Sequence, residues 1–447
     1  MRISKVLAVL CVALIAATDN FAQTPSATLT LRQCIEAALT NNLDVKQRDL
    51  DMQRDWVTLR GAKGNMLPSL NGSVDHTLRQ GRSIDPYTNS YTNQSNTSAS
   101  YNLSSDVTLF NGFRLFNNLR AAQFLYEAGK MELQQSKDIL TLNVILAYLQ
   151  VLTNLDVLIQ SERLAEVTTK QVERLEIMNK EGAIKPSDLY DMKGQQAGNK
   201  MAVINARNDL NASRLNLAQL MNMPYDETLT VERLTADQFD MSYTASADSI
   251  YQVALQQLAQ IKVIELVKKS AEKSVQSARG NLYPSIGMGG GINTNFSGAA
   301  RDSANKKIKY YDQLSNNYST NVGIGINIPI LNGFSARNQL SMAKIALKNA
   351  EYVAQTTQIQ LRQNIERDHL NMIATLNRYQ ALVEQVGSYT ENFRAAEVRF
   401  NAGASTSVDY LIAKNNLDQA TLNLIIARYG YVLRTKILDY YQGKLGW

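Results

Sequence analysis

Four segments of the chain alternate between apolar and polar residues, as β-strands with one apolar and one polar face do. They cover about residues 70–78, 101–109, 286–292 and 318–330. In the second segment, Tyr101, Leu103 and Val107 share one face, and serine, asparagine, aspartate and threonine occupy the other. Each segment is near the length of a membrane-spanning strand. A soluble hairpin packed on helices would show the same alternation, so the strands alone leave both interpretations open.

Two much longer segments carry a helical pattern. Residues 114–181 and 335–402 contain no proline and one glycine each, Gly129 and Gly387, and apolar residues recur mostly every three or four positions. Each segment therefore predicts one unbroken helix of roughly 100 Å with a stripe for coiled-coil or bundle packing. Shorter helices are expected at about 31–66, 187–221, 249–282 and 409–440.

The strands and helices occur in two copies. Residues 109–113 (Leu-Phe-Asn-Gly-Phe) recur at 330–334, an offset of 221, whereas residues 62–69 recur at 278–285, an offset of 216. The second copy thus carries five extra residues between its Pro-Ser break and its Asn-Gly turn, which predicts a longer loop there. We expect a first repeat at 23–223, a linker at 224–246 and a second repeat at 247–447, integrated into one domain.

The N-terminus has the features of a secretory signal. Arg2 and Lys5 precede an apolar run at 6–17 that is too short to span a bilayer, and Ala22 offers a cleavage point. We therefore expect residues 1–22 to be removed on export. Cys34 is then the one remaining cysteine, which excludes an internal disulfide. The apolar window 139–155 is interrupted by polar residues, so we interpret it as the buried face of a long helix, with a transmembrane helix as the alternative.

Export together with two-faced strands favours a membrane barrel built from several copies. Four strands cannot close a barrel, and unpaired strand edges are not tolerated in lipid. Two copies would supply eight strands, about the number whose interior is filled by side chains, whereas three would supply twelve around a water-filled lumen. The polar strand faces suit such a lumen.

The composition offers little chemistry for an enzyme. The two histidines, His76 and His369, have no cysteine or carboxylate at ligand spacing, so neither a metal nor another cofactor is expected. The net charge of +6, or +5 after removal of residues 1–22, is too small over this length to indicate nucleic-acid binding. The glycine run at 287–291 lies in a strand and not before a helix, which argues against a phosphate loop.

An ordered set of motifs resembles the outer membrane efflux proteins of the TolC family. The set comprises the opening segment 29–42 with its terminal Asn-Asn, the paired Pro-Ser breaks, the paired Asn-Gly turns, and Arg399, Gly403 and Asp409 in their Arg-x3-Gly-x5-Asp spacing. The resemblance extends from Leu29 to about Tyr441. It implies an α+β membrane protein: a homotrimer with a twelve-stranded outer membrane β-barrel, four strands per chain, continued by a periplasmic α-helical barrel.

The same resemblance implies a function. Such a channel passively exports solutes, whether drugs, other small molecules or proteins. It receives them from a periplasmic adaptor, the membrane fusion protein, and an inner membrane transporter. Two other hypotheses stay open on the residues alone. One is an exported coiled-coil adhesin or envelope spacer without a pore, and the other is an envelope enzyme, which lacks a catalytic constellation.

The mechanism is expected where each long helix ends at a glycine and the next helix begins near Asp188 or Asp409. An aspartate at a helix start is commonly a cap. The resemblance implies instead that Asp409, with Asp188 as its counterpart, lines a periplasmic constriction as a ring of carboxylates. It also assigns adaptor docking to the surrounding residues Gly182, Ala183, Ile184, Arg399, Gly403, Ala404 and Ser405. The chain departs from the family at Phe400, Ser405 and Ile412, where tyrosine, arginine and a second aspartate are common, so a salt-bridge latch is not expected.

Overall fold

The computed structural model describes residues 28–84, 89–92, 95–233 and 242–445. The expected signal peptide at 1–22 and part of the expected linker at 224–246 lie outside these ranges. The chain divides into two compact units, and each unit draws on both halves of the sequence. Within the described residues, the helical unit comprises 28–43, 137–233, 242–250 and 365–445, and the sheet unit comprises 44–84, 89–92, 95–136 and 251–364.

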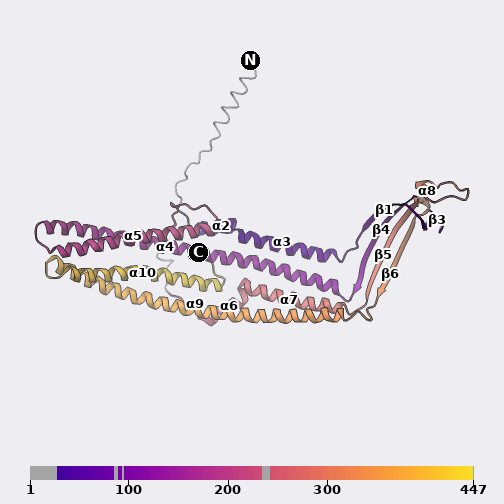
Figure 1. The fold of residues 1–447 in the computed structure, drawn as a ribbon. Coiled ribbons are helices and arrows are strands. Elements are labelled where there is room, and N and C mark those ends of the chain that lie inside the picture. The colour runs from indigo at the N-terminus through magenta and orange to yellow at the C-terminus, as the bar shows by residue number, and fades with distance from the viewer. Residues whose placement is uncertain (1–27, 85–88, 93–94, 234–241, 446–447) are drawn as a thin grey trace, which may run out of the picture. The chain divides into compact units, whose positions relative to one another are not determined.

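The two long helices have the same length and spacing as the sequence repeat. Helix α4 spans Arg114–Lys180 and α9 spans Ser335–Asn401, 67 residues each, and both are continuous (Figure 1). Each is followed by a helix of 35 residues, α5 at Pro186–Leu220 and α10 at Ser407–Tyr441. The unbroken helices expected from the absence of proline are therefore confirmed.

The single helices expected at 31–66 and 249–282 are wrong, because each is broken once. The structure has α2 at Leu31–Asn41 and α3 at Leu43–Gly64, then α6 at Ala247–Gln257 and α7 at Ala259–Gly280. The breaks fall at Asn42 and Leu258, where the backbone is extended with ψ of 128° and 127°. An extended residue cannot continue a helix. The two breaks lie 216 residues apart, so they belong to the repeat.

The apolar window of α4 forms a core of the helical unit. Val144, Tyr148 and Leu152 are almost fully buried there, and the Tyr148 hydroxyl donates to the Glu232 carbonyl at 2.6 Å. Among the described residues, α4 is the one helix apolar and long enough to cross a membrane, but half of its most apolar window is buried inside the protein. The interpretation as a buried helix face is confirmed. Burial also raises the pKa of the Cys34 thiol to about 11, which keeps it unreactive.

The sheet unit contains a four-stranded antiparallel sheet in the order β1-β4-β5-β6. The strands are β1 at Asn71–Arg79, β4 at Asn96–Asn111, β5 at Ser285–Ser297 and β6 at Ser319–Asn327. Two short strands, β2 at Ser83–Ile84 and β3 at Tyr91–Thr92, pair separately. Strands from the two repeats are joined by the β4–β5 ladder, and β1 and β6 are the edges.

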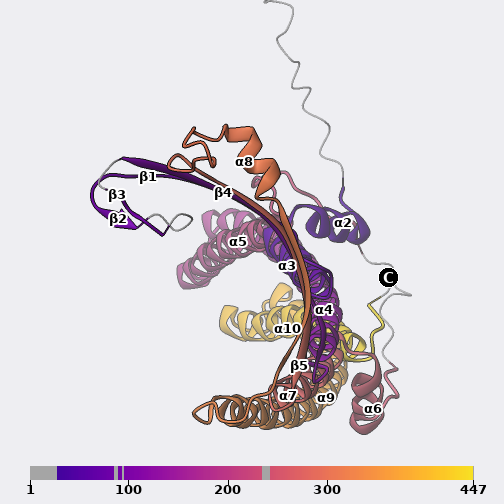
Figure 2. The same cartoon turned by 90° about the vertical axis from the view of Figure 1, so that its right-hand side faces the viewer.

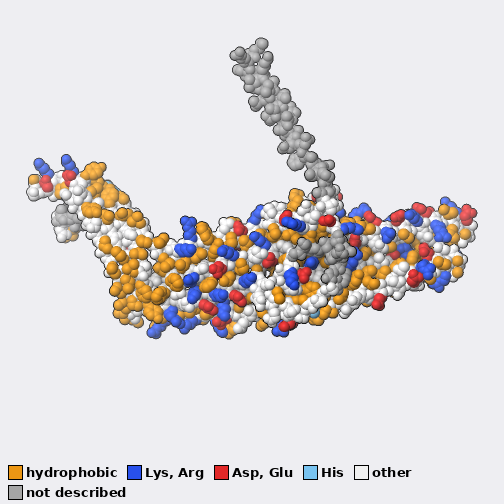
Figure 3. All heavy atoms as spheres, turned by 180° about the vertical axis from the view of Figure 1, so that it is seen from behind, with side chains coloured by type: hydrophobic (Ala, Val, Ile, Leu, Met, Phe, Trp, Pro, Cys, Tyr) orange, Lys and Arg blue, Asp and Glu red, His pale blue; other side chains and the backbone are white. Residues whose placement is uncertain are grey.

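Strand register places apolar side chains on one face of the sheet and polar side chains on the other. Leu103 pairs with Ile292, and Met288 pairs with both Val107 and Ile324. The other face carries mainly Ser, Asn, Thr, Asp and Gly, as in the pairs Asn102↔Asn293, Asp106↔Gly289 and Gly291↔Asn321. Apolar side chains accordingly gather on the surface over the strands (Figure 3). The two-faced strands predicted from alternation are confirmed.

Two glycine backbones meet where the repeats join. Gly112 has φ of +64°, and a Cβ built on it would lie 2.5 Å from the Gly280 carbonyl oxygen and 2.9 Å from the Gly280 Cα. A Cβ on Gly280 would in turn lie 2.9 Å from the Gly112 carbonyl oxygen. The Asn-Gly turn of the first repeat therefore packs directly on the C-terminus of α7 in the second.

This contact predicts that alanine in place of Gly112 strongly destabilises the fold. Gly112→Ala should lower the free energy of unfolding for two reasons. An L-residue at such a positive φ is strained by about 1–2 kcal/mol. In addition, its Cβ would clash with the backbone of Gly280. Gly182→Ala is the matched control, because Gly182 has φ of +66° and a Cβ added to it would have no atom within 4 Å. Thermal unfolding followed by circular dichroism should show a clearly larger loss for Gly112→Ala. Equal losses would contradict the close approach.

Candidate functional site

Two glycine turns close the helix pairs of the helical unit, and we call residues 181–188 and 402–409 the tip. Gly182 and Gly403 have φ of +66° and +70°. The following amides bond back into the helix, Ala183 N to Met178 O at 2.8 Å and Ala404 N to Arg399 O at 2.9 Å. This is the expected left-handed helix cap, which only glycine adopts without strain.

The two helices that leave the tip are capped differently. Helix α10 begins with a capping box: the Asp409 amide donates to Thr406 Oγ1 at 3.2 Å, and the Thr406 amide donates to Asp409 Oδ2 at 3.2 Å. The Thr406 hydroxyl also donates to Asp409, and this bond is the main reason that the pKa of Asp409 is lowered. Helix α5 begins at Pro186, and its N-cap residue Lys185 makes no side-chain cap. Asp409 is thus a capping residue, which is one of the two roles expected for it.

Asp188 has another partner. The hydroxyl of Ser407, which is 1% exposed, lies 2.8 Å from Asp188 Oδ1 and 3.2 Å from Asp191 Oδ2. A hydroxyl carries one proton, so it can donate fully to one carboxylate at a time. We call these three residues the serine latch, because they join the start of α10 to the start of α5. Asp188 was identified from the sequence, whereas Asp191 and Ser407 were missed.

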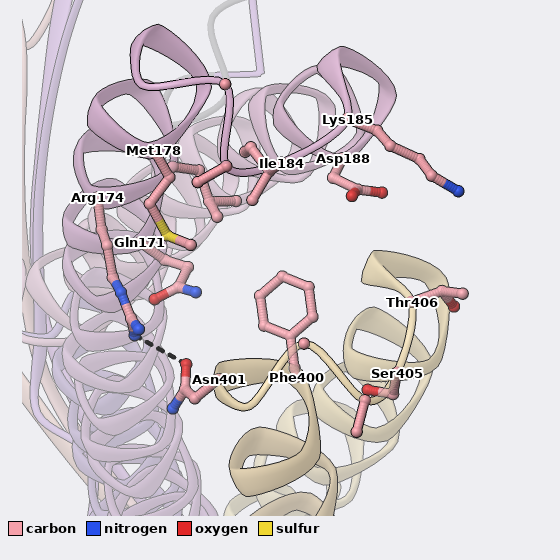
Figure 4. A pocket seen from close by; sticks show the side chains of 15 residues that line it. Gln171, Arg174, Met178, Ile184, Lys185, Asp188, Phe400, Asn401, Ser405 and Thr406 are labelled. Carbon is pink, nitrogen blue, oxygen red and sulfur yellow. Dashed lines mark hydrogen bonds between the residues drawn. The ribbon is translucent and has the colours of Figure 1, made fainter.

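A pocket of about 660 Å³ lies between the two turns. Phe400 projects into it from α9, opposite Met178 and Ile184 (Figure 4). On one side, Arg174 Nη1 donates to Asn401 Oδ1 at 2.8 Å, which makes a second link between the helix pairs. The pocket therefore has an apolar centre and polar links at its margin.

Aromatic side chains pack behind the pocket. Phe400 stacks on the buried Tyr410 with ring centres 4.9 Å apart, and Phe393 approaches the same ring at 5.5 Å. They join an apolar cluster with Leu175 and Met192, and burial raises the pKa of Tyr410 to about 12. Phe400 takes part in this packing through its ring alone.

Helix α10 also holds a buried ion pair close to this cluster. Lys414 is 3% exposed, and its Nζ lies 2.5 Å from Asp418 Oδ2. Burial raises the pKa of Asp418, and the lysine partly offsets that effect. Removal of either partner would leave a buried charge uncompensated, so the pair fixes the packing of this part of α10.

Six of the seven residues to which the family resemblance assigns docking lie in the tip, and the seventh, Arg399, lies in the last turn of α9 before it. Five of the seven are exposed: Gly182, Ala183, Arg399, Gly403 and Ala404. Ile184 is half-buried against the apolar cluster, and the half-buried Ser405 has a hydroxyl oxygen without a hydrogen-bond partner among the described residues. The two glycine turns themselves expose only glycine and alanine at Gly182, Ala183, Gly403 and Ala404, which leaves their backbone open to contact.

The sequence profile of a family described as "Outer membrane efflux protein" matches residues 34–223 and 250–438. The two matched stretches cover most of the chain and fall in the two copies of the repeat. The shared pattern therefore extends over both halves and is not confined to a single motif.

Individual relatives match over most of their length, and a solved structure has a similar fold. The chain is 22% identical to outer membrane protein TolC of Salmonella enteritidis over 93% of this chain and 82% of that protein. It is 22% identical to toxin and drug export protein A of Aggregatibacter actinomycetemcomitans, over 90% of this chain and 83% of that one. Among solved structures, outer membrane protein VceC of Vibrio cholerae superposes with a TM-score of 0.78 at 17% identity, covering 93% of this chain and 96% of that chain.

The serine latch predicts a local change on loss of its hydroxyl. Ser407→Ala removes the donor shared by Asp188 and Asp191, and a hydrogen bond to a charged group is strong enough that its loss should raise local opening about tenfold or more. Amide hydrogen exchange should accelerate in residues 186–191 and 407–411. Ser249→Ala is the control, because the Ser249 hydroxyl donates to the Ser246 carbonyl within the same helix start and joins no second helix. An unchanged exchange rate at the tip would show that the serine latch does not stabilise the starts of α5 and α10.

Proposed function

The chain belongs to the outer membrane efflux protein family, and on that basis we propose that three copies close into one export duct gated at the tip. The protein is an outer membrane export channel with a periplasmic helical extension, and it is not an enzyme. Membership also argues against an adhesin or spacer without a pore. The observation that carries the proposal is the four-stranded sheet with two free edges, one from each repeat.

The sheet edges require additional strands. In hydrocarbon, each unpaired backbone N–H or C=O costs several kcal/mol, so an open sheet cannot face lipid. Strand β6 runs antiparallel to its neighbour and ends the sheet on the side of the second repeat, while β1 begins it on the side of the first. Pairing β6 of one copy with β1 of the next satisfies both edges and repeats the β4–β5 junction already present within one chain. A ring of identical copies follows from this head-to-tail pairing.

The glycine contact supports the same arrangement. Gly112 and Gly280 touch within one chain, and their counterparts in the other repeat are Gly333, 221 residues on, and Gly64, 216 residues back. Neither Gly333 nor Gly64 has an atom within 4 Å of an added Cβ. We propose that Gly333 of one copy packs on Gly64 of the next. The repeats, 23–223 and 247–447 joined by 224–246, then become six equivalent segments of one wall.

Three is the smallest number of copies that leaves a channel. Eight strands give an interior filled by side chains, and twelve leave a lumen. The face opposite the apolar one is lined by serine, asparagine and glycine, which suits water. The apolar face with Leu103 and Ile326 would contact lipid.

We propose that the tip receives a periplasmic adaptor linked to an inner membrane transporter. Gly182, Ala183, Gly403 and Ala404 expose backbone and small side chains there, and Ile184, Arg399 and Ser405 flank them. The solute would be chosen by the transporter, since the polar face of the sheet is lined mainly by small polar residues. Export of toxins and drugs is named for one relative and fits such a wall.

Gating would use the links between the two helix pairs. Opening requires α9 and α10 to move relative to α4 and α5, which breaks the serine latch and the Arg174–Asn401 bond. At the tip these links are hydrogen bonds, whereas farther along the helices Arg428 of α10 forms an ion pair with Asp156 of α4 at 3.1 Å. Asp409 is exposed within its capping box and would supply negative charge where three tips converge.

The ring predicts a specific cross-link. Asn102 of β4 pairs with Asn293 of β5 within one chain. The residue that corresponds to Asn102 in the second repeat is Gly323 of β6, and the residue that corresponds to Asn293 in the first repeat is Thr77 of β1. The ring therefore places Gly323 of one copy opposite Thr77 of the next. Antiparallel partners have Cα atoms about 4.5–5.5 Å apart, within disulfide range. Gly323→Cys with Thr77→Cys should therefore form covalent species of up to three chains on a non-reducing gel after mild oxidation. Cys34 is buried and should not interfere.

The matched control moves one cysteine by one residue. Leu78 points to the opposite face from Thr77, so Gly323→Cys with Leu78→Cys should not bridge. Cross-linking of the control pair, or a first pair that yields only monomers, would reject the β6–β1 junction. A series that stops at two chains would reject the ring.

The gate predicts a charge effect at Asp409. Asp409→Asn keeps an acceptor for Thr406 but removes the negative charge, so single-channel recordings should show weaker cation preference and weaker block by multivalent cations. The fold should be retained because the capping box is preserved. Asp188→Asn should act in the same direction.

Asp248→Asn supplies the comparison, since it removes an exposed carboxylate from the first turn of α6, outside the tip. It should leave selectivity and block unchanged. Wild-type selectivity in both Asp409→Asn and Asp188→Asn would leave Asp409 with a capping role alone and reject the carboxylate ring.

A further inference from the structure

The connection between β5 and β6 forms a folded lobe, residues 298–318, which we call the outer lobe. It contains a bridge between Arg301 and Lys307 and the helix α8 at Tyr310–Asn316. The five residues by which the second repeat exceeds the first lie in this connection, because β5 follows the offset of 216 and β6 that of 221. The lobe is thus a longer version of the connection between β1 and β4, at the end of the strands away from their helix junctions.

A buried glutamine fixes the outer lobe to the sheet. Gln313 is 3% exposed; it accepts from the Ser297 amide at 2.9 Å and donates to the carbonyls of Ser297 and Ile308, both at 3.0 Å. Thr294 adds a bond from its hydroxyl to the Leu314 carbonyl at 2.6 Å. The lobe is therefore a built structure with satisfied polar groups.

The hairpin that carries the charges is also ordered. Asp302 Oδ1 accepts from the amides of Ala304 at 2.9 Å and Lys306 at 2.8 Å, and the Asp302 amide donates to the Lys306 carbonyl at 2.9 Å. The Asp302 carboxylate therefore accepts hydrogen bonds from backbone amides and stabilises the turn that precedes Lys307 and Lys309. Its role in the turn leaves it poorly placed to neutralise them.

The outer lobe lies on the apolar face of the sheet. Tyr310 meets the Tyr101 hydroxyl with its own hydroxyl and packs its ring 4.5 Å from that of Phe296. Both partners belong to the apolar face, and α8 accordingly lies on the convex side of the curved sheet (Figure 2). Tyr311 and Tyr318 are largely exposed nearby, as aromatic residues are at a membrane–water interface. In an outer membrane channel, this side of the sheet faces lipid and this end faces the exterior.

Four basic side chains are exposed on the lobe: Arg301, Lys306, Lys307 and Lys309. Its acidic residues are Asp302 and Asp312. Within the described chain, none of the three lysines forms an ion pair with a carboxylate, and Arg301 donates to the carbonyls of Gly298 and Ala300. The lobe therefore presents net positive charge beside an aromatic interface.

We propose that the outer lobe binds the phosphate groups of an anionic lipid in the outer leaflet; this rests on the proposed membrane barrel. Its lysines lie in the connection beyond the ends of β5 and β6, where headgroups would begin in such a barrel, and ammonium groups bind phosphate as point charges. The tyrosines set the depth of the lobe, and the Gln313 contacts hold the lysines at that depth. The bound lipid would anchor the barrel laterally and keep its outer rim at a fixed height.

The test uses the full-length protein in neutral detergent, with bisphosphorylated lipid A added to the micelles and binding followed by native mass spectrometry. The triple variant Lys306→Gln, Lys307→Gln and Lys309→Gln should weaken binding about tenfold or more, because each charge contributes at the headgroup. Arginine at all three positions should restore it. Added salt should weaken wild-type binding and affect the glutamine variant little. The same spectra report the number of chains, so failure of the barrel is distinguished from failure of the lipid site.

The control replaces three exposed lysines on helices, Lys46, Lys200 and Lys344, by glutamine, and it should bind as wild type. Equal loss in this control would show a net-charge effect and overturn the proposal. So would undiminished binding by the lobe variant, equal binding of dephosphorylated lipid A, or full competition by millimolar inorganic phosphate, which would indicate a free-anion site. Circular dichroism of each variant confirms that the fold is intact, and the arginine variant tests the site without loss of charge.

Discussion

The unpaired backbone N–H and C=O groups on the outer edges of strands β1 and β6 are the constraint on which the rest of the structure depends. A bilayer offers no water to satisfy an exposed strand edge, and the sheet has one such edge from each repeat. The apolar side chains on one face of the sheet place it in lipid, and its polar second face requires water behind it. Only a closed ring with a wet interior meets both conditions. The channel function thus follows from a backbone constraint more than from any individual side chain.

The internal repeat supplies the geometry of that ring. The β4–β5 ladder and the Gly112–Gly280 contact already join the two repeats within one chain. Repetition of this junction between copies needs no new type of contact. Where the long helices end, the same repeat brings two glycine turns together, but their capping differs: Thr406 and Asp409 form a capping box, and Lys185 does not. That asymmetry frees Asp188 to bond with Ser407, so the repeat diverges where the proposed gate lies.

The parts of the fold that could be predicted from the sequence are those with long, consistent patterns. Absence of proline over 67 residues predicted α4 and α9, and strict alternation predicted the two faces of the sheet. The breaks at Asn42 and Leu258 were missed because neither residue is a helix breaker; their extended backbone depends on the surrounding structure. Asp191 and Ser407 were missed because their contact joins residues 216 positions apart. The outer lobe was predicted only as a longer loop, since Gln313 acts through burial that no local pattern reveals.

Three copies, and no fewer, should close the duct. The decisive experiment is native mass measurement of the mature protein, extracted from outer membranes into a mild detergent. We expect one stable species with the mass of three chains, which persists on dilution. A stable monomer or dimer as the principal species would contradict the proposed ring, because one or two chains leave either unpaired edges or a barrel too narrow to conduct.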